Sequence, residues 1–197
     1  MYNNILDVKG LKVGQVEDKE GLTGCTVVIC EKGAVCGVDV RGGGPGTRET
    51  DLLDPINMIQ KVHAVVLSGG SAFGLESTCG VSRYLEENNI GFDVGVAKVP
   101  IVVGAVLFDL AVGNPKSRPN IEMGYKACEL ASNTELNQGN FGAGCGATVG
   151  KIKGIEYSMK GGIGSYSIKL PNGLVVSALV AVNALVYSSF HYLKFLL

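Results

Sequence analysis

The chain has 197 residues, of which 46% are hydrophobic, and 17 basic side chains against 18 acidic ones leave a formal net charge of −1. This composition is typical of one folded unit with a sizeable core, and it excludes an intrinsically disordered chain. The balanced charge provides no basic surface for nucleic acid or for an anionic membrane, so we expect neither as a partner.

Residues 1–7 carry neither the basic segment nor the apolar segment of a secretory signal peptide. The six cysteines include no C-x-x-C pair, and the chain has only two histidines. This pattern predicts reduced, mostly buried thiols rather than disulfides or a zinc site. We therefore expect a cytoplasmic protein that needs neither a metal nor another cofactor.

The first half of the chain predicts strands and loops followed by a helix. Two β-branched runs in residues 25–40 flank an E-K-G segment and indicate a hairpin. Residues 41–55 read as a glycine-rich irregular loop with a short helix beginning at Asp51. Residues 62–68 predict a buried strand, and a G-G turn then leads into a helix over residues 71–88.

The second half predicts more strands and one further helix. Residues 99–108 form an apolar, strand-like run, and Asn120 is a suitable N-cap for a helix that reaches about residue 132. Three more strands are predicted at residues 146–152, 163–170 and 174–183. Residues 174–197 are nearly all apolar, but polar residues interrupt the run, and its Val-rich first half favours a strand over a membrane helix.

Two glycine-containing motifs resemble known sites without meeting their criteria. GAGCGATVG, residues 142–150, is no dinucleotide fingerprint, because its third glycine comes too early and a strand follows instead of a helix. LSGGSAFG, residues 67–74, places a serine on a strand-to-helix turn, but Phe73 stands where a nucleophile elbow needs glycine. We expect the first motif to be a tightly packed turn. Ser71 is expected to cap its helix, whose N-terminus can face a ligand's carboxylate.

Common catalytic groups are scarce. His63 lies beside a buried strand and His191 lies in the apolar tail, so a Ser-His-Asp triad is close to excluded. Asp51, Asp54 and Asp109 adjoin turns and are expected to anchor loops rather than to act in catalysis. Taken one by one, the residues identify no complete catalytic set.

Six motifs occur in a characteristic order and spacing: RGGGPGTRETDLL, VVLSGGSAFGLES, VPIVVGAVLFDL, GNFGAGCGATVGK, KGGIGSYS and LVAVNA. Together, over residues 5–184, they closely resemble the DmpA-like self-cleaving aminopeptidases. This family includes the L-aminopeptidase/D-esterases, the β-aminopeptidases and the nylon-oligomer hydrolases. The resemblance implies an α/β fold of the α+β kind, a four-layer αββα sandwich that is incomplete at the C-terminus of this chain.

The resemblance also implies a mechanism. Such enzymes are made as one precursor, which cuts itself before a serine or threonine, and the freed residue becomes the nucleophile. Its α-amine, with a pKa of about 8, can accept the hydroxyl proton. The implied activity removes N-terminal residues from peptides, amides or esters without a cofactor, and the intact family members are homo-oligomers.

Candidate site residues follow from the matched motifs. In the family, an asparagine after an apolar strand donates its side-chain amide to the oxyanion, and the match in LVAVNA is Asn183. Ser71, Phe108 and Lys160 stand in matched motifs and are expected to line the substrate pocket. Phe108 occupies a position where some members place a tyrosine, so a hydroxyl role there is not expected.

The resemblance stops at Ala184, which predicts an α-chain-like part in residues 1–184 and an aberrant apolar tail in residues 185–197. The segment that bears the nucleophile is then expected to be absent, through a frameshift or an early stop, and the chain alone is expected to be inactive. Two other interpretations stay open. One is a non-catalytic small-molecule-binding protein on the same scaffold, and the other is a nonfunctional fragment.

Overall fold

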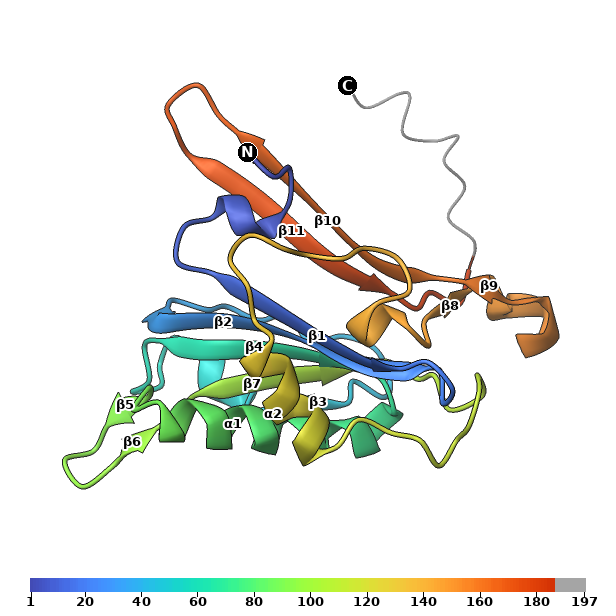
Figure 1. Cartoon of the computed structure of the whole chain (residues 1–197), viewed down its shortest axis with the longest axis horizontal. Helices are drawn as coiled ribbons and strands as arrows, with labels where there is room; N and C mark the ends of the chain where they lie inside the picture. The colour runs from blue at the N-terminus through green and yellow to red at the C-terminus, as the bar shows by residue number, and fades with distance from the viewer. Residues whose placement is uncertain (187–197) are drawn as a thin grey trace.

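A five-stranded sheet lies at the centre of the fold, with the strand order β1-β2-β4-β7-β3 (Figure 1). The computed structural model describes residues 1–186. Neighbouring strands run antiparallel except β4 and β7, which are parallel and therefore need a crossover connection, provided by α1. The strands of this sheet are β1 (Lys12–Asp18), β2 (Thr23–Ala34), β3 (Thr47–Arg48), β4 (Val62–Ser68) and β7 (Val102–Val106).

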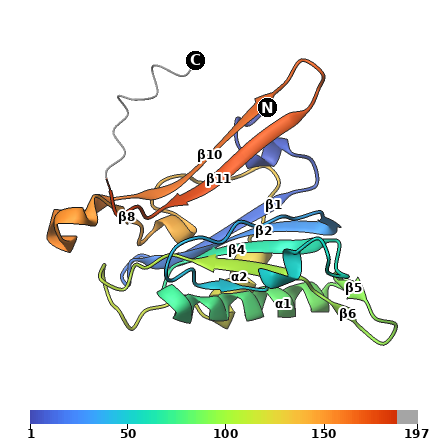
Figure 2. The ribbon, with the colours of Figure 1, turned by 180° about the vertical axis from the view of Figure 1, so that it is seen from behind.

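Both α-helices pack on one face of this sheet, as Figures 1 and 2 show from opposite sides. Alternate residues of the strands point toward the helices. Val27 and Val66 therefore belong to the same core cluster as Leu85 of α1, and all three are fully buried. The second helix begins where it is predicted, because the Oδ1 atom of Asn120 accepts the Met123 N–H at 3.0 Å. The helices are η3 (Ser71–Glu76), α1 (Ser77–Glu87) and α2 (Ile121–Glu129).

A hairpin of β10 (Gly162–Lys169) and β11 (Val175–Val182) forms a layer on the side of the sheet away from the helices (Figures 1 and 2). Its strands are antiparallel, with Tyr166 opposite Ala178. Tyr166 and Val176 are 63% and 55% exposed. The strand predicted at residues 174–183 is therefore present, but one of its apolar faces is open rather than buried.

The described residues thus contain three layers, a helical one, the sheet and the hairpin, which confirms the mixed α/β class and matches three of the four layers expected. Short elements connect them. The short strands are β5 (Phe92–Asp93), β6 (Lys98–Val99), β8 (Thr148–Val149) and β9 (Met159–Lys160). The short 3₁₀ helices are η1 (Ile5–Asp7), η2 (Asp51–Leu53), η4 (Gly142–Gly144), η5 (Lys151–Lys153) and η6 (Ile155–Tyr157).

The hairpin predicted at residues 25–40 is wrong. β2 continues as one strand to Ala34, and its antiparallel partner is β1, a strand that the sequence pattern did not predict. Gly33 has a φ of +68°, and the pairing with β4 shifts between Ile29 and Ala34, so the E-K-G segment forms a bulge instead of a turn. The strand predicted at residues 146–152 is likewise shortened to β8, because η5 follows it directly.

The strands predicted at residues 62–68 and 99–108 and the helix at residues 71–88 are confirmed as β4, β7 and the η3–α1 segment. All six cysteines are free thiols, as expected. Among residues 1–186, no helix is long and apolar enough to cross a membrane. His191 and nearly all of the apolar tail lie outside the described residues.

His63 makes stability depend on pH. It is 7% exposed within β4, and its Nδ1 atom accepts the Ile101 N–H at 3.2 Å. Burial, and secondarily the charge of Lys61, lowers its pKa below the ordinary 6.5. The unfolded chain then binds more protons between the two pKa values, so His63 contributes stability above about pH 6.5 that is lost as the pH falls.

We expect the free energy of unfolding to fall more steeply from pH 7.5 to pH 5 in the wild type than in His63→Gln. Glutamine is uncharged at both pH values, so this contribution disappears in the variant. Urea unfolding at a series of pH values measures both slopes. Equal slopes in the two proteins would show that His63 carries none of the pH dependence.

Candidate active site

Asn183 directly follows β11, and its side-chain amide is held from both ends. Its Oδ1 atom accepts the Thr148 N–H and the Lys151 ammonium, each at 2.9 Å. Its Nδ2 atom donates to the Phe108 carbonyl, also at 2.9 Å. These partners define which end is oxygen and which is nitrogen. An amide nitrogen carries two hydrogens, and within the described part of the chain Nδ2 has this one acceptor, so its second N–H can donate to a bound oxygen atom.

Lys151 is a site residue that the sequence did not identify. Its Nζ atom also donates to the Thr148 carbonyl at 2.7 Å and to the Asn183 carbonyl at 3.1 Å. Burial of the ammonium group lowers its pKa. A cation bound to the oxygen of an amide polarises the amide and strengthens its N–H groups as donors. The sequence feature that could have predicted its role is a lysine directly after the GATVG turn, a pattern too common to identify a site residue by itself.

Among residues 1–186, Thr148 provides a hydroxyl that contacts both members of this pair, and its Oγ1 atom lies 3.0 Å from the Lys151 ammonium. A threonine beside a lysine could be a nucleophile with its base. Thr148 is, however, only 4% exposed, and its hydroxyl is within hydrogen-bond distance of both Lys151 and Asn183. These contacts favour a supporting role for Thr148 beside the Asn183 amide.

Ser71 and Phe108 follow the C-terminal ends of the neighbouring strands β4 and β7 and lie near each other. The Ser71 N–H donates to the carbonyl of Leu107 at 3.0 Å, one residue before the carbonyl that orients Asn183. The Phe108 side chain is 55% exposed. The structure thus brings Ser71, Phe108 and Asn183 around one segment.

The capping role expected for Ser71 is wrong. Gly70 is the N-cap of η3, and no side-chain hydrogen bond caps that helix. Ser71 instead takes a left-handed conformation with a φ of +54°. Such a conformation costs on the order of 1 kcal/mol or more in a residue other than glycine. Gly70 and Ser71 are thus both left-handed in the turn that leads from β4 into η3.

Lys160, in β9, bonds to the turn that precedes β8. Its ammonium donates to the carbonyls of Cys145 and, at 3.2 Å, Ala147, and burial lowers its pKa. Lys160 lines two cavities. One also contains Phe141 and Cys145, and the other contains Thr148 and Glu156. Thr148, whose N–H donates to Asn183, thus forms part of the wall of the second cavity, whereas Asn183 itself lines neither of the two.

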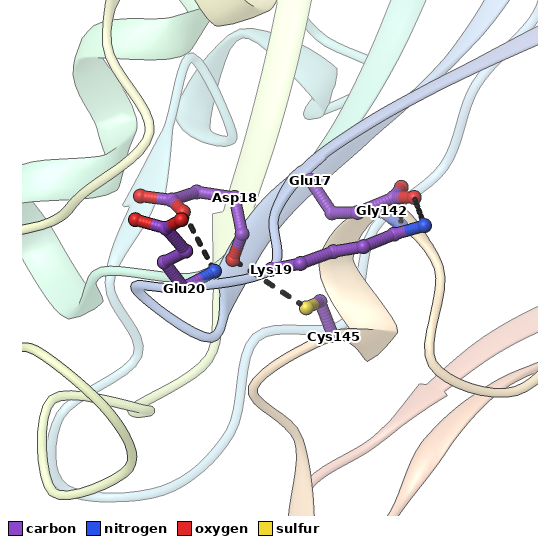
Figure 3. Close-up of polar contacts among 6 residues, drawn as sticks. All are labelled: Glu17, Asp18, Lys19, Glu20, Gly142 and Cys145. Carbon is purple, nitrogen blue, oxygen red and sulfur yellow. Dashed lines mark hydrogen bonds and ion pairs between the residues drawn. The ribbon is translucent and has the colours of Figure 1, made fainter.

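The GAGCGATVG motif forms the packed turn that was predicted. Figure 3 shows Gly142 and Cys145 of this motif beside the end of β1. Glu17, at the end of β1, accepts the Gly142 N–H at 3.0 Å, and the Cys145 Sγ atom lies 3.8 Å from the Asp18 carbonyl. A Cβ atom at Gly144 would lie 2.4 Å from the backbone nitrogen of Ile163, so only glycine fits there. Cys145 is 3% exposed, and burial raises its pKa, which argues against a nucleophilic thiolate.

Two solved structures share this fold. The l-aminopeptidase d-Ala-esterase/amidase of Ochrobactrum anthropi, described as a variant of the N-terminal-nucleophile hydrolase fold, superposes with a TM-score of 0.71 at 19% identity, covering 92% of this chain and 53% of that one. A Burkholderia sp. β-aminopeptidase superposes with a TM-score of 0.67 at 23% identity, covering 94% of this chain and 53% of that one. The fold is therefore that of this aminopeptidase class.

Residues 3–193 match the family model of peptidase family S58, so the chain belongs to that family, as the motif resemblance predicted. An uncharacterized aminopeptidase of Mycobacterium leprae is 44% identical over 197 residues, covering 92% of this chain and 52% of the relative. A 6-aminohexanoate-oligomer endohydrolase of Kocuria sp. is 35% identical over 146 residues, covering 74% of this chain and 39% of the relative. The chain spans about half the length of the first of these relatives.

Proposed function

We propose that this chain is the Asn183-bearing part of a cytoplasmic, cofactor-independent aminopeptidase or amidase with an N-terminal nucleophile. It would act on peptides, amides or esters with a free N-terminal residue. The single observation that carries the proposal is the Asn183 amide, which is oriented by three partners with one N–H left for a substrate oxygen. Membership of a peptidase family, and relatives named aminopeptidase and oligomer hydrolase, support it.

In the proposed reaction, a serine or threonine hydroxyl attacks the scissile carbonyl while its own α-amine takes the proton. The carbonyl oxygen becomes an oxyanion and receives the free Asn183 N–H, which the Lys151 cation polarises. We place the nucleophile outside residues 1–184. Within the described residues, the side-chain hydroxyl that is hydrogen-bonded to the Asn183 side chain belongs to the buried Thr148. Ser71, Phe108 and Lys160 are proposed to border the substrate.

Homo-oligomer formation is a further part of the proposal. The outer face of the β10–β11 hairpin carries Tyr166, Ile168, Val176 and Val180, each at least half exposed. An apolar face of this kind is commonly covered by another layer or by another subunit.

Self-cleavage is the direct test of the proposed function. We expect the 197-residue chain to keep its intact mass on long incubation and to leave aminoacyl-p-nitroanilides unhydrolysed. We expect a chimera, in which residues 1–184 are followed by the part of the M. leprae relative that lies C-terminal to its aligned region, to split into two fragments and to hydrolyse these substrates. Mass spectrometry and release of p-nitroaniline measure both properties.

Three outcomes of this test would argue against the proposal. Two defined fragments from the 197-residue chain would place a self-cleaving nucleophile within it. Turnover by that chain, abolished in Ser71→Ala, would make Ser71 the nucleophile. A folded chimera that binds an aminoacyl amide without cleaving it would favour the small-molecule-binding protein.

A further inference from the structure

We infer that Asp109 is a positioning residue for Asn183: its buried carboxylate fixes the turn whose Phe108 carbonyl orients the Asn183 amide. The inference rests on the proposed function in that Asn183 is taken as the group to be oriented. Asp109 was expected only to anchor a loop. The structure assigns it a more specific task, because the loop that Asp109 anchors contains Phe108, whose carbonyl binds the Asn183 amide.

The Asp109 carboxylate joins the ends of three strands. It is 2% exposed and follows β7. Its Oδ1 atom accepts the Gly70 N–H, just after β4, at 2.6 Å, and its Oδ2 atom accepts the Thr23 hydroxyl, at the start of β2, at 2.8 Å. A buried carboxylate is costly unless both of its oxygens are hydrogen-bonded. These two bonds therefore hold Asp109 in one place relative to the central sheet.

Two glycines from separate segments make room for this carboxylate. A Cβ atom at Gly146 would lie 2.5 Å from the Asp109 Oδ2 atom, and a Cβ atom at Gly69 would overlap the same oxygen. Gly146 belongs to the turn that leads into β8, so the socket also fixes the approach to Thr148. A socket walled by backbone leaves little room for a longer or displaced side chain.

The connection from Asp109 to Asn183 is short and runs through backbone. The carbonyl of Phe108, the residue before Asp109, accepts the Asn183 Nδ2 group at 2.9 Å. The backbone on both sides is also hydrogen-bonded. The Leu107 N–H donates to the backbone carbonyl of Ser68, and the Val112 N–H donates to the backbone carbonyl of Asp109. Moving Asp109 therefore moves the Phe108 carbonyl and turns the Asn183 N–H that is left for substrate. Displacements of about 1 Å at such a group can cost on the order of 100-fold in rate.

Three substitutions separate this role from a chemical role of the charge. In Asp109→Asn, the amide oxygen can accept the Gly70 N–H, and the Thr23 hydroxyl can rotate to accept the new N–H, so both bonds persist. Asp109→Ala removes both bonds. Asp109→Glu keeps the charge but is too long for the socket. A positioning role thus predicts that Asp109→Asn preserves the orientation of the Asn183 amide, whereas Asp109→Ala and Asp109→Glu do not.

The test uses the ¹⁵N-labelled 197-residue chain and the NMR signals of the Asn183 side-chain amide, assigned by their loss in Asn183→Asp. We expect Asp109→Ala and Asp109→Glu to shift these signals and to speed their hydrogen exchange by about tenfold, as for a lost or weakened hydrogen bond. We expect Asp109→Asn to keep them near the wild-type position. His63→Gln, a buried change on β4, is the control and should leave them in place.

Two results would overturn the inference: Asn183 signals that do not move in Asp109→Ala, or signals that move equally in His63→Gln at matched stability. If Asp109→Ala fails to fold, Thr23→Val removes one of the two bonds and should move the same signals less far. Because no turnover is measured, this test is separate from that of the oxyanion role. Asn183 signals that respond to Asp109, together with unchanged turnover in Asn183→Ala, would support positioning and reject the oxyanion role.

Discussion

Asn183→Ala is expected to lower kcat by about 10²–10³-fold in the self-cleaved chimera, the usual loss for one oxyanion donor. In the proposed reaction, the second N–H of Asn183 would meet an oxygen whose full negative charge exists only in the transition state. Its orientation costs nothing during the reaction, because Phe108, Thr148 and Lys151 already hold the amide. KM is expected to change less than kcat, since the neutral carbonyl gains little from the same bond.

Two further variants make the measurement specific. Asn183→Asp has the same shape but lacks both N–H donors and would place a carboxylate oxygen against the Phe108 carbonyl, so we expect a loss at least as large. Asn172→Ala, in the loop between β10 and β11, is the matched control, because the Asn172 side chain accepts the nearby Leu174 N–H at 3.0 Å and has no bond to the Asn183 site within the described residues. Unchanged kcat in Asn183→Ala, with the fold intact by circular dichroism, would remove Asn183 from the mechanism.

Gly124→Ala is expected to reduce the free energy of unfolding by about 2–3 kcal/mol, as overpacking does at a close contact. Gly124 lies where α2 crosses α1, and a Cβ atom there would lie 2.8 Å from the carbonyl carbon of Ser77 and overlap its oxygen. Alanine favours a helix over glycine by about 1 kcal/mol. The clash outweighs this gain, because backbone atoms cannot rotate away as a side chain can.

The helices would have to separate, which would open the core around Val81 and Leu85. Gly80→Ala, on the facing helix, should behave in the same way, since its Cβ atom would lie 2.7 Å from the Tyr125 nitrogen. Gly44→Ala is the control, because a Cβ atom there would meet no described atom within 4 Å beyond the adjacent residues, and Gly44 has no positive φ. Urea unfolding of the 197-residue chain compares the three variants. A midpoint for Gly124→Ala equal to that of the wild type would show that the helices adapt without cost.

The sequence alone determined those elements whose signals are local. The apolar run of β4, the Val-rich run of β11 and the Asn120 cap of α2 each act within a few residues. Six ordered motifs were also sufficient to predict the family, because the match as a whole is specific even where a single glycine turn is not.

The tertiary structure decided whatever depends on residues far apart in the chain. β2 is one strand rather than a hairpin because β1 pairs with it, and neither segment encodes that choice by itself. The orientation of Asn183 comes from Phe108, 75 residues earlier, and from Thr148, 35 residues earlier. Lysine is a common surface residue, so the sequence does not mark Lys151 as part of a site. Lys151 joins the site only because the fold places the end of β11 beside its ammonium group. Periodicity and capping report on neighbours in sequence, whereas hydrogen bonds between distant segments form only once packing has brought their donors and acceptors together.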